Sequence, residues 1–286
     1  MGSLTMPTFD TPNPINATIT VVGGTVRVSA GDAGATTVTV EPTDASNAED
    51  RKAAEQTRVE YTNGQLLVRA PKLRSWLPRQ TGGSIDVRVE LPAASQVHAG
   101  GALADFILDG PLADVRLKTG LGHIQVEHAA TLNVKTGIGD VNVERVTGHA
   151  DVADGSGEVR VRDLDATAVI KNSNGDTWVG TARGDLRVSA ANGNIAIDAA
   201  HASVVAKSAN GDVRLGEAVR QSVVLETSIG DLEVGIPEGT AAWLDVRAAA
   251  GKVRNSLDAA TAPDAAAETV EVRARTTVGD VVIRRS

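Results

Sequence analysis

The chain has 286 residues, a formal net charge of −8 and only 2% aromatic residues. An acidic chain with no run of more than two basic residues lacks the positive face that nucleic-acid binding needs, so we expect no nucleic-acid partner. It contains no cysteine, which excludes disulfides, thiolate nucleophiles and cysteine-bound zinc. Val, Ile, Leu and Ala must therefore fill the core, and a thin core fits this composition best.

Residues 1–14 have neither the basic start nor the apolar stretch of a signal peptide, and we expect a tag or a disordered N-terminus there. No apolar run in the chain approaches the roughly 18 residues that indicate a membrane span. We therefore expect a cytoplasmic protein with no direct membrane insertion.

Residues 15–112 predict an irregular N-terminal β region that caps one end of the fold. Alternating apolar and polar residues indicate strands near Ala17–Val22, Thr25–Ser29, Thr37–Glu41, Arg58–Tyr61, Leu66–Ala70 and Ser84–Leu91. Residues 44–57 are polar and rich in alanine, which is typical of either a short helix or a loop. Residues 72–80 predict a loop that is bounded by prolines and carries Trp76.

Residues 113–255 contain an internal repeat, and this repeat decides the architecture. Its glycines recur every 18 residues, with one step of 19 at the end: Gly139, Gly157, Gly175, Gly193, Gly211 and Gly230. Each 18-residue period divides into two nine-residue units whose second and fourth positions are apolar, with the single exception of Thr177. Period-two alternation over four or five residues indicates a strand with one buried face.

Two strands and two unlike corners make one predicted coil of about 18 residues. Asn-Gly between alternating strands is also the usual signal for an antiparallel hairpin. We reject the hairpin alternative because a meander would have no reason to repeat so closely at every second turn. The predicted fold is therefore all-β, a single-stranded parallel β-helix (β-solenoid), and the crossover rule suggests by analogy that it is right-handed.

The C-terminal part is less regular. Trp243–Arg247 and Lys252–Asn255 predict one looser coil, residues 256–268 a surface loop, and residues 269–286 the strands that close the stack.

The chain resembles the bacterial β-strand-repeat family usually labelled "putative adhesin", from about Ile15 onward. The similarity rests on the strand Ser84–Pro92 and on Gly-Asp-Val corners such as those at 139–141, 211–213 and 279–281. It implies a single-stranded parallel β-helix without an established biochemical activity. Members are often attached to envelope or stress-response proteins through extra segments, whereas this chain shows no membrane helix and no signal.

A row of acidic residues follows the repeat glycines: Asp140, Glu158, Asp176, Asp212 and Asp231, interrupted by Asn194. Stacked carboxylates would repel one another unless they were hydrated, paired or bridged by a cation. The glycine-rich nonapeptide of calcium β-rolls is absent. We expect local hydrogen bonds to the turn, helped by Lys135, Lys171 and Lys207, and no metal or cofactor. The five histidines lack metal-site spacing, and His123 and His149 fall on outward positions.

Trp178 lies at an outward position and is the one candidate contact for a partner; covering a neighbouring corner is the alternative interpretation. No catalytic triad or phosphate loop can be named, so we predict no enzyme activity. The sequence favours a non-catalytic scaffold or protein-interaction module, monomeric or in a small oligomer, with an unknown protein partner. A filament subunit that stacks end to end and a β-helix enzyme acting on polysaccharide are the alternatives.

Overall fold

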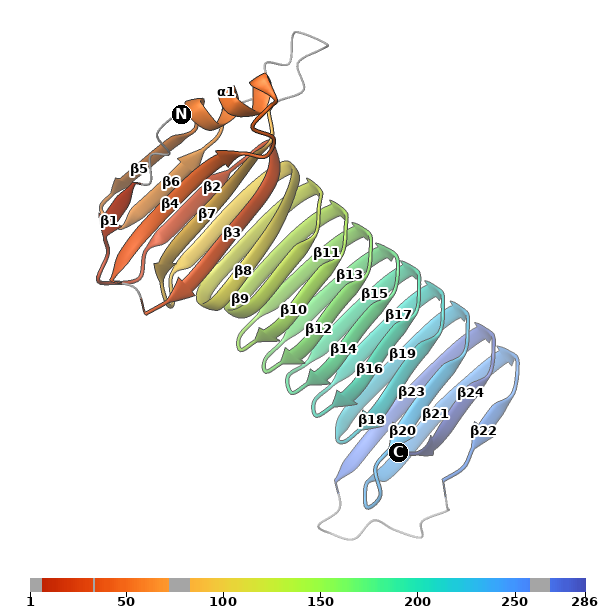
Figure 1. Ribbon diagram of the computed structural model, residues 1–286. Coiled ribbons are helices and arrows are strands. Elements are labelled where there is room, and N and C mark those ends of the chain that lie inside the picture. The colour runs from red at the N-terminus through yellow and green to blue at the C-terminus, as the bar shows by residue number, and fades with distance from the viewer. Residues whose placement is uncertain (1–6, 33, 72–82, 258–267) are drawn as a thin grey trace. The chain divides into compact units, whose positions relative to one another are not determined.

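The computed structural model describes residues 7–32, 34–71, 83–257 and 268–286. These residues form two compact units, Met1–Asn142 and Val143–Ser286. Both are built from parallel strands wound as a solenoid, with one short helix among the described residues, so the predicted all-β solenoid is confirmed (Figure 1). The predicted loop with Trp76 and most of the predicted loop at 256–268 lie outside the described residues.

The first unit holds one helix and strands of very unequal length. Its elements are β1 (Thr8–Asp10), β2 (Asn16–Thr20), β3 (Gly23–Gly31), β4 (Ala35–Pro42), α1 (Ala48–Gln56), β5 (Arg58–Thr62), β6 (Gln65–Arg69), β7 (Ile85–Pro92), β8 (Gln96–Leu121) and β9 (Ile124–Ile138).

The coils of the first unit do not stack in chain order. Strand β2 lies between β6 and β8, and β3 lies between β7 and β8, all in parallel. Antiparallel strands then end both of these parallel strand stacks. Strand β5 pairs with β6, β4 pairs with β7, and β1 pairs with β4. The predicted cap therefore works by reversing strand direction, which leaves no parallel edge to extend.

Helix α1 lies within the polar stretch 44–57 and forms part of this cap. The Asn47 side chain accepts a hydrogen bond from the Glu49 N–H at the helix start. The buried Asp50 carboxylate accepts from the backbone N–H groups of Asp44 and Ser84. It thus ties the helix to the start of β7.

The second unit follows from strand β10 (Val141–Val146), which contains the boundary. Its remaining strands are β11 (Ala150–Ser156), β12 (Val159–Leu164), β13 (Ala168–Asn174), β14 (Thr177–Ala182), β15 (Leu186–Asn192), β16 (Ile195–Ala200), β17 (Val204–Asn210), β18 (Val213–Ala218), β19 (Gln221–Ile229), β20 (Leu232–Ile236), β21 (Ala241–Ala250), β22 (Val253–Asn255), β23 (Thr269–Val278) and β24 (Val281–Arg285).

Odd-numbered and even-numbered strands form the two walls of this unit. From β11 to β18 the strands pair in parallel with their equivalents 18 residues later, as in Val161 with Val179 and Val188 with Ala206. The register lengthens to 19 at β19, where Ala206 pairs with Leu225. Gln221 there has a positive φ of 71°, which accommodates the extra residue. The parallel pairing of β13 with β15 excludes the hairpin alternative at Gly175.

The last strands of the chain are not the last strands of the stack. Strand β23 lies between β19 and β21, and β24 lies between β20 and β22. The coil of β21 and β22 therefore occupies the end position, which corrects the expectation that residues 269–286 close the stack. Stacking order cannot be read from chain order when a later coil inserts between two earlier ones.

Inward side chains of both walls make the core, and most are aliphatic, as the composition requires. Phe106 is the largest of the fully buried side chains, and Thr177 is buried at the inward position that its place in the repeat predicts. In the ranges that the structure describes, no helix is long and apolar enough to cross a membrane.

Candidate functional site

The repeat glycines lie at equivalent corners and all have positive φ: Gly139, Gly157, Gly175, Gly193, Gly211 and Gly230. At Gly175, φ is 130°, and a Cβ atom would collide with the carbonyl oxygen of Gly157 in the preceding coil. Backbone conformation and close stacking therefore both require glycine at this corner.

The residues that follow these glycines form a hydrogen-bonded ladder in the second unit. An Asp176 oxygen accepts from the Asn194 N–H at 2.8 Å, and the Asn194 oxygen accepts from the Asp212 N–H at 2.9 Å. The ladder continues through Asp231, Asp280 and Lys252, each of whose N–H groups donates to the carboxylate one coil earlier in the stack.

This ladder corrects our interpretation of the acidic row. Its side-chain oxygens accept from the N–H of the adjacent coil rather than from their own turn, and Asn194 supplies an acceptor oxygen in the same way as the aspartates. Lys207 does not serve the ladder, since its Nζ lies 2.6 Å from Glu226 Oε2. Across the described residues no group of three or more His, Asp or Glu side chains could hold a metal ion.

The first unit has the same type of corner hydrogen bond between adjacent coils, made by more varied residues. Asp86 accepts from the Thr25 N–H, Asp105 accepts from the His123 N–H, and His123 Nδ1 accepts from the Asp140 N–H at 3.2 Å. His123 is exposed, as predicted, but its ring nitrogen takes the place of a carboxylate oxygen in the ladder.

A second polar row, which was not predicted from the sequence, lies inside the same corners. The Asn172 amide donates to the carbonyl oxygens of Gly157 and Gly175, and the Thr227 hydroxyl donates to that of Gly211. Thr119, Ser208 and Thr276 make the same type of bond to a carbonyl one coil away. A hydroxyl or amide residue three positions before the corner glycine is the sequence signal.

Trp178 lies on the outer face of β14, where its ring packs over Gly180 of the same strand. Its Nε1–H donates to Asp198 Oδ1 at 3.2 Å. Together with Glu158, Arg160 and Asp176, among others, it lines a hollow of about 290 Å³. The ring therefore covers its own strand, although one side still borders this hollow.

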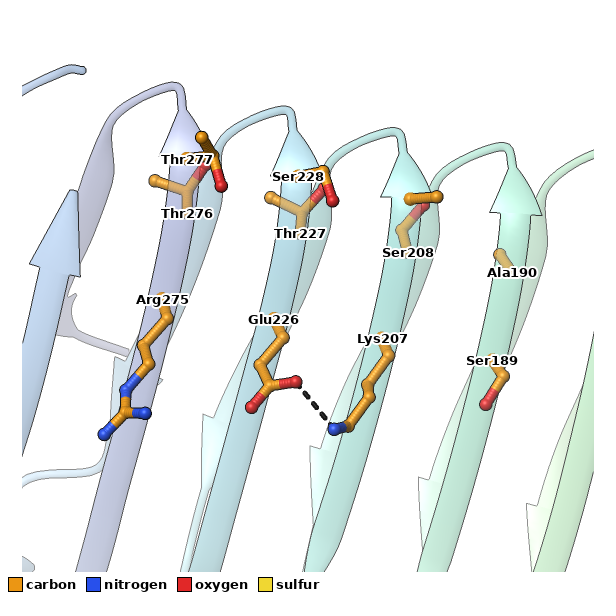
Figure 2. A pocket seen from close by; sticks show the side chains of 11 residues that line it. Ser189, Ala190, Lys207, Ser208, Glu226, Thr227, Ser228, Arg275, Thr276 and Thr277 are labelled. Carbon is orange, nitrogen blue, oxygen red and sulfur yellow. Dashed lines mark ion pairs between the residues drawn. The ribbon is translucent and has the colours of Figure 1, made fainter. Parts of the chain in front are cut away.

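A larger hollow of about 470 Å³ lies on the outer face of β15, β17, β19 and β23. Figure 2 shows Lys207, Glu226 and Arg275 in one row across three adjacent strands, with hydroxyl residues nearer the corner. Lys207 pairs with Glu226, and Arg275 Nη2 lies 3.0 Å from Asp245 Oδ2. These charges neutralise one another, so the hollow is a poor site for a strongly charged ligand.

A charge cluster crosses three coils on the even-numbered wall. Asp165 accepts from Arg145 at 2.7 Å and from Arg183 at 2.8 Å, and Arg183 also contacts Asp163. The hydrogen bond from Arg145 is the main reason why the pKa of Asp165 lies below its ordinary value, with Arg183 adding to the effect. The cluster links adjacent coils by paired charges.

The first unit exposes a row of large apolar side chains at consecutive corners on one side of its coils. Leu103, Leu121 and Ile138 have exposed fractions of 60, 50 and 55%. Leu121 pairs with Ile138, and Gly120 and Gly122 stack on Ala102 and Ala104, so the three side chains follow one another coil by coil. We call Leu103, Leu121 and Ile138 the apolar ridge.

The ridge was not predicted from the sequence, although its signal is visible as an apolar residue between two glycines at 120–122 and at 137–139. In the second unit the equivalent row is polar at Asn174, Asn192 and Asn210, where Asn192 donates to Asn174, and it becomes apolar again at the exposed Ile229 and Val278. The corner alone therefore does not require an apolar residue at this position.

The chain matches one family model and is similar to several solved structures. The family model described as Toastrack DUF4097 matches residues 16–284. A "putative lipid binding protein" from Parabacteroides distasonis ATCC 8503 is similar, with 11% identity, a TM-score of 0.44, and coverage of 98% of this chain and 97% of that one. A "putative adhesin" from Parabacteroides merdae ATCC 43184 has 12% identity, a TM-score of 0.42, and coverage of 100% and 97%.

A "putative adhesin" from Bacteroides fragilis NCTC 9343 has 11% identity, a TM-score of 0.37, and coverage of 100% of this chain and 98% of that one. None of these three is described as an enzyme. No curated protein matches the sequence.

Proposed function

The chain belongs to the Toastrack DUF4097 family, a family of unknown function, and we propose that it is a non-catalytic β-solenoid module that binds a protein partner. The apolar ridge carries this proposal. A contiguous row of exposed Leu and Ile side chains is unfavourable in water and is typical of an interaction site. The partner surface would be an apolar groove that accepts three side chains spaced by one coil, about 4.8 Å each.

The surroundings of the ridge support a protein partner. Lys118 and Lys135 form a paired outward row on β8 and β9, three residues before Leu121 and Ile138. Asp105 and Asp140 lie just after the ridge positions. An apolar centre with charged residues on both sides is the usual anatomy of a protein interface.

The two alternatives have less support. The antiparallel strands that end the first unit oppose endless stacking of one chain on another, which a filament would need. A polysaccharide enzyme would need clustered acid and base groups beside aromatic platforms. In the described residues Trp178 packs on its own strand, and the nearby charges are engaged in ion pairs such as that of Arg160 with Glu158.

The proposal is tested by capture from native extract with quantitative mass spectrometry, using Leu121→Ser with Ile138→Ser as the variant. The matched control is Asn174→Ser with Asn192→Ser, which changes the equivalent corner positions in the second unit. We expect a partner that both wild type and control retain and that the ridge variant loses at least about tenfold, because a few central apolar residues dominate interface affinity. Equal capture by all three proteins, with the ridge variant folded by circular dichroism, contradicts the proposal.

A further inference from the structure

The end coil of the second unit is less covered than the coils before it. Among the described strands, β21 pairs with β23 on one side and with no other strand. Its inward residues Ala242, Leu244 and Val246 are partly exposed, whereas their partners in β23, including Val272 and Ala274, are fully buried. Trp243 on the same strand is 60% exposed. This ten-residue edge contains no proline that would prevent further pairing.

The corner ladder ends at this coil, and its last residue differs in kind. The Lys252 N–H donates to Asp280, but a lysine side chain has no oxygen to accept from a following coil. Every preceding position of the ladder from Asp176 to Asp280 supplies such an acceptor. A further parallel coil is therefore disfavoured here, and an antiparallel strand is the remaining way to pair the edge.

We propose that β21 pairs antiparallel with β21 of a second copy of this chain, in a two-fold dimer centred on Val246. Inward residues must face inward residues in such a pair, which restricts the possible registers. Centring the axis on Asp245 would oppose two aspartates, and centring it on Arg247 would oppose two arginines. Centring it on Val246 places Asp245 of each copy opposite Arg247 of the other, so the strand is complementary to itself.

The apolar residues fit the same register. Val246 faces its own copy, and Leu244 faces Ala248, so the core of the unit continues into the second copy. Trp243 faces the small Ala249 and gains cover for its exposed ring. Charge complementarity within one strand is the reason to choose a second copy over an unrelated strand, and this contact is independent of the apolar ridge.

Light scattering during size exclusion tests the dimer across a concentration series. The 29.4 kDa chain is expected to approach 58.8 kDa, which is 2 × 29.4, as concentration rises. Arg247→Asp and Asp245→Arg should each weaken self-association at least about tenfold, because like charges then face each other. A mixture of the two variants should restore the dimer, since one strand is then wholly acidic and the other basic at these positions. A mass of 29.4 kDa at all concentrations, or dimers unaffected by either variant, overturns the proposal.

A cross-link provides a second readout that does not depend on charge. The chain has no cysteine, so Val246→Cys introduces a single thiol at the proposed axis. Directly opposed residues of antiparallel strands lie within disulfide range, and mild oxidation should give a covalent dimer. Glu60→Cys on the edge strand β5 of the first unit is the control and should give no covalent dimer, because β5 is not part of the proposed contact. Equal cross-linking of both variants, or none from Val246→Cys, counts against the two-fold contact.

Discussion

The dipeptide Asn-Gly has opposite consequences in the two units. At Asn63–Gly64 both residues have positive φ, 51° and 75°, and the chain returns as the antiparallel hairpin of β5 and β6. At Asn192–Gly193 only the glycine has positive φ, and the chain continues to a strand on the other wall, so that neighbours are parallel. The turn residues alone therefore do not decide strand direction.

The surroundings of the two turns explain the difference. Gly193 stacks directly on the backbone of Gly175, and the following Asn194 exchanges hydrogen bonds with the coils on both sides. A Cβ atom at Gly64 would meet no atom within 4 Å, so no backbone packs against Gly64 in that direction, although its carbonyl oxygen accepts from the Asn16 N–H. Parallel stacking is thus maintained by close corner contacts that recur every 18 or 19 residues, whereas the hairpin glycine has no such close contact.

The largest effect should come from replacing the stacked glycine. We expect Gly193→Ala to lower the free energy of unfolding by about 3 kcal/mol or more, because the methyl group collides with the Gly175 carbonyl in a strained conformation. Gly64→Ala should lower it by about 1 kcal/mol, the penalty for left-handed backbone alone. Urea denaturation of both variants measures the difference, and equal losses would contradict the role of stacking.

A buried charge should come next in effect. Val188→Asp puts a carboxylate into the fully buried core of the second unit, and we expect a loss of about 3 kcal/mol. Val59→Asp, on the partly exposed edge strand β5, should cost about 1 kcal/mol or less. Thermal melting of the two variants tests whether an introduced carboxylate destabilises the regular coils more than it destabilises the cap.

A smaller effect is expected at the ladder. Asp212→Ala leaves the Asp231 N–H without its side-chain acceptor and should cost about 1 kcal/mol. Asp212→Asn keeps an acceptor oxygen, as Asn194 does naturally, and should be nearly neutral. A loss as large for Asn as for Ala, measured by urea denaturation, would mean that charge rather than hydrogen bonding matters here.

The smallest effect should be the contribution of Asp165 to the free energy of unfolding and its loss at low pH. Arg145 and Arg183 hold the pKa of Asp165 below its ordinary value of 3.8, so this group stabilises the fold fully above that value. The contribution is lost as pH falls below 3.8 through the lowered pKa of the folded state. Asp165→Asn should therefore reduce stability by roughly 0.2–1 kcal/mol at pH 7 and flatten its decline in acid. Unfolding curves from pH 7 to about pH 3 show whether the free energies of unfolding of wild type and Asp165→Asn converge in acid, as expected.

Much of the fold could be predicted because local pattern and repeat agree. Alternating residues such as Val159 and Val161 define the strands, and the 18-residue spacing defines which of them pair. The antiparallel cap and the insertion of β23 between β19 and β21 could not be predicted, because strand order at the ends depends on long-range packing. One signal was available: Lys252 stands where every coil from Asp212 to Asp280 has an acidic acceptor.

The candidate site was less predictable. The acidic row was visible in the sequence, but the N–H groups that its oxygens accept from belong to other coils. The positions of Thr227 and Leu121 relative to their corner glycines are visible in the sequence, but the burial of the one and the exposure of the other are known only from the structure. Hydrogen bonds between adjacent coils, and the exposure of corner side chains, are therefore known only once the three-dimensional register is known.

The most direct test of parallel stacking compares two disulfides in this cysteine-free chain. Arg187 and Val205 are register partners in the parallel arrangement, whereas a hairpin at Asn192–Gly193 would place Arg187 opposite Asp198. We predict rapid disulfide formation in Arg187→Cys with Val205→Cys and none in Arg187→Cys with Asp198→Cys, since β15 and β16 lie on opposite walls. A disulfide in the second variant but not in the first would contradict the solenoid.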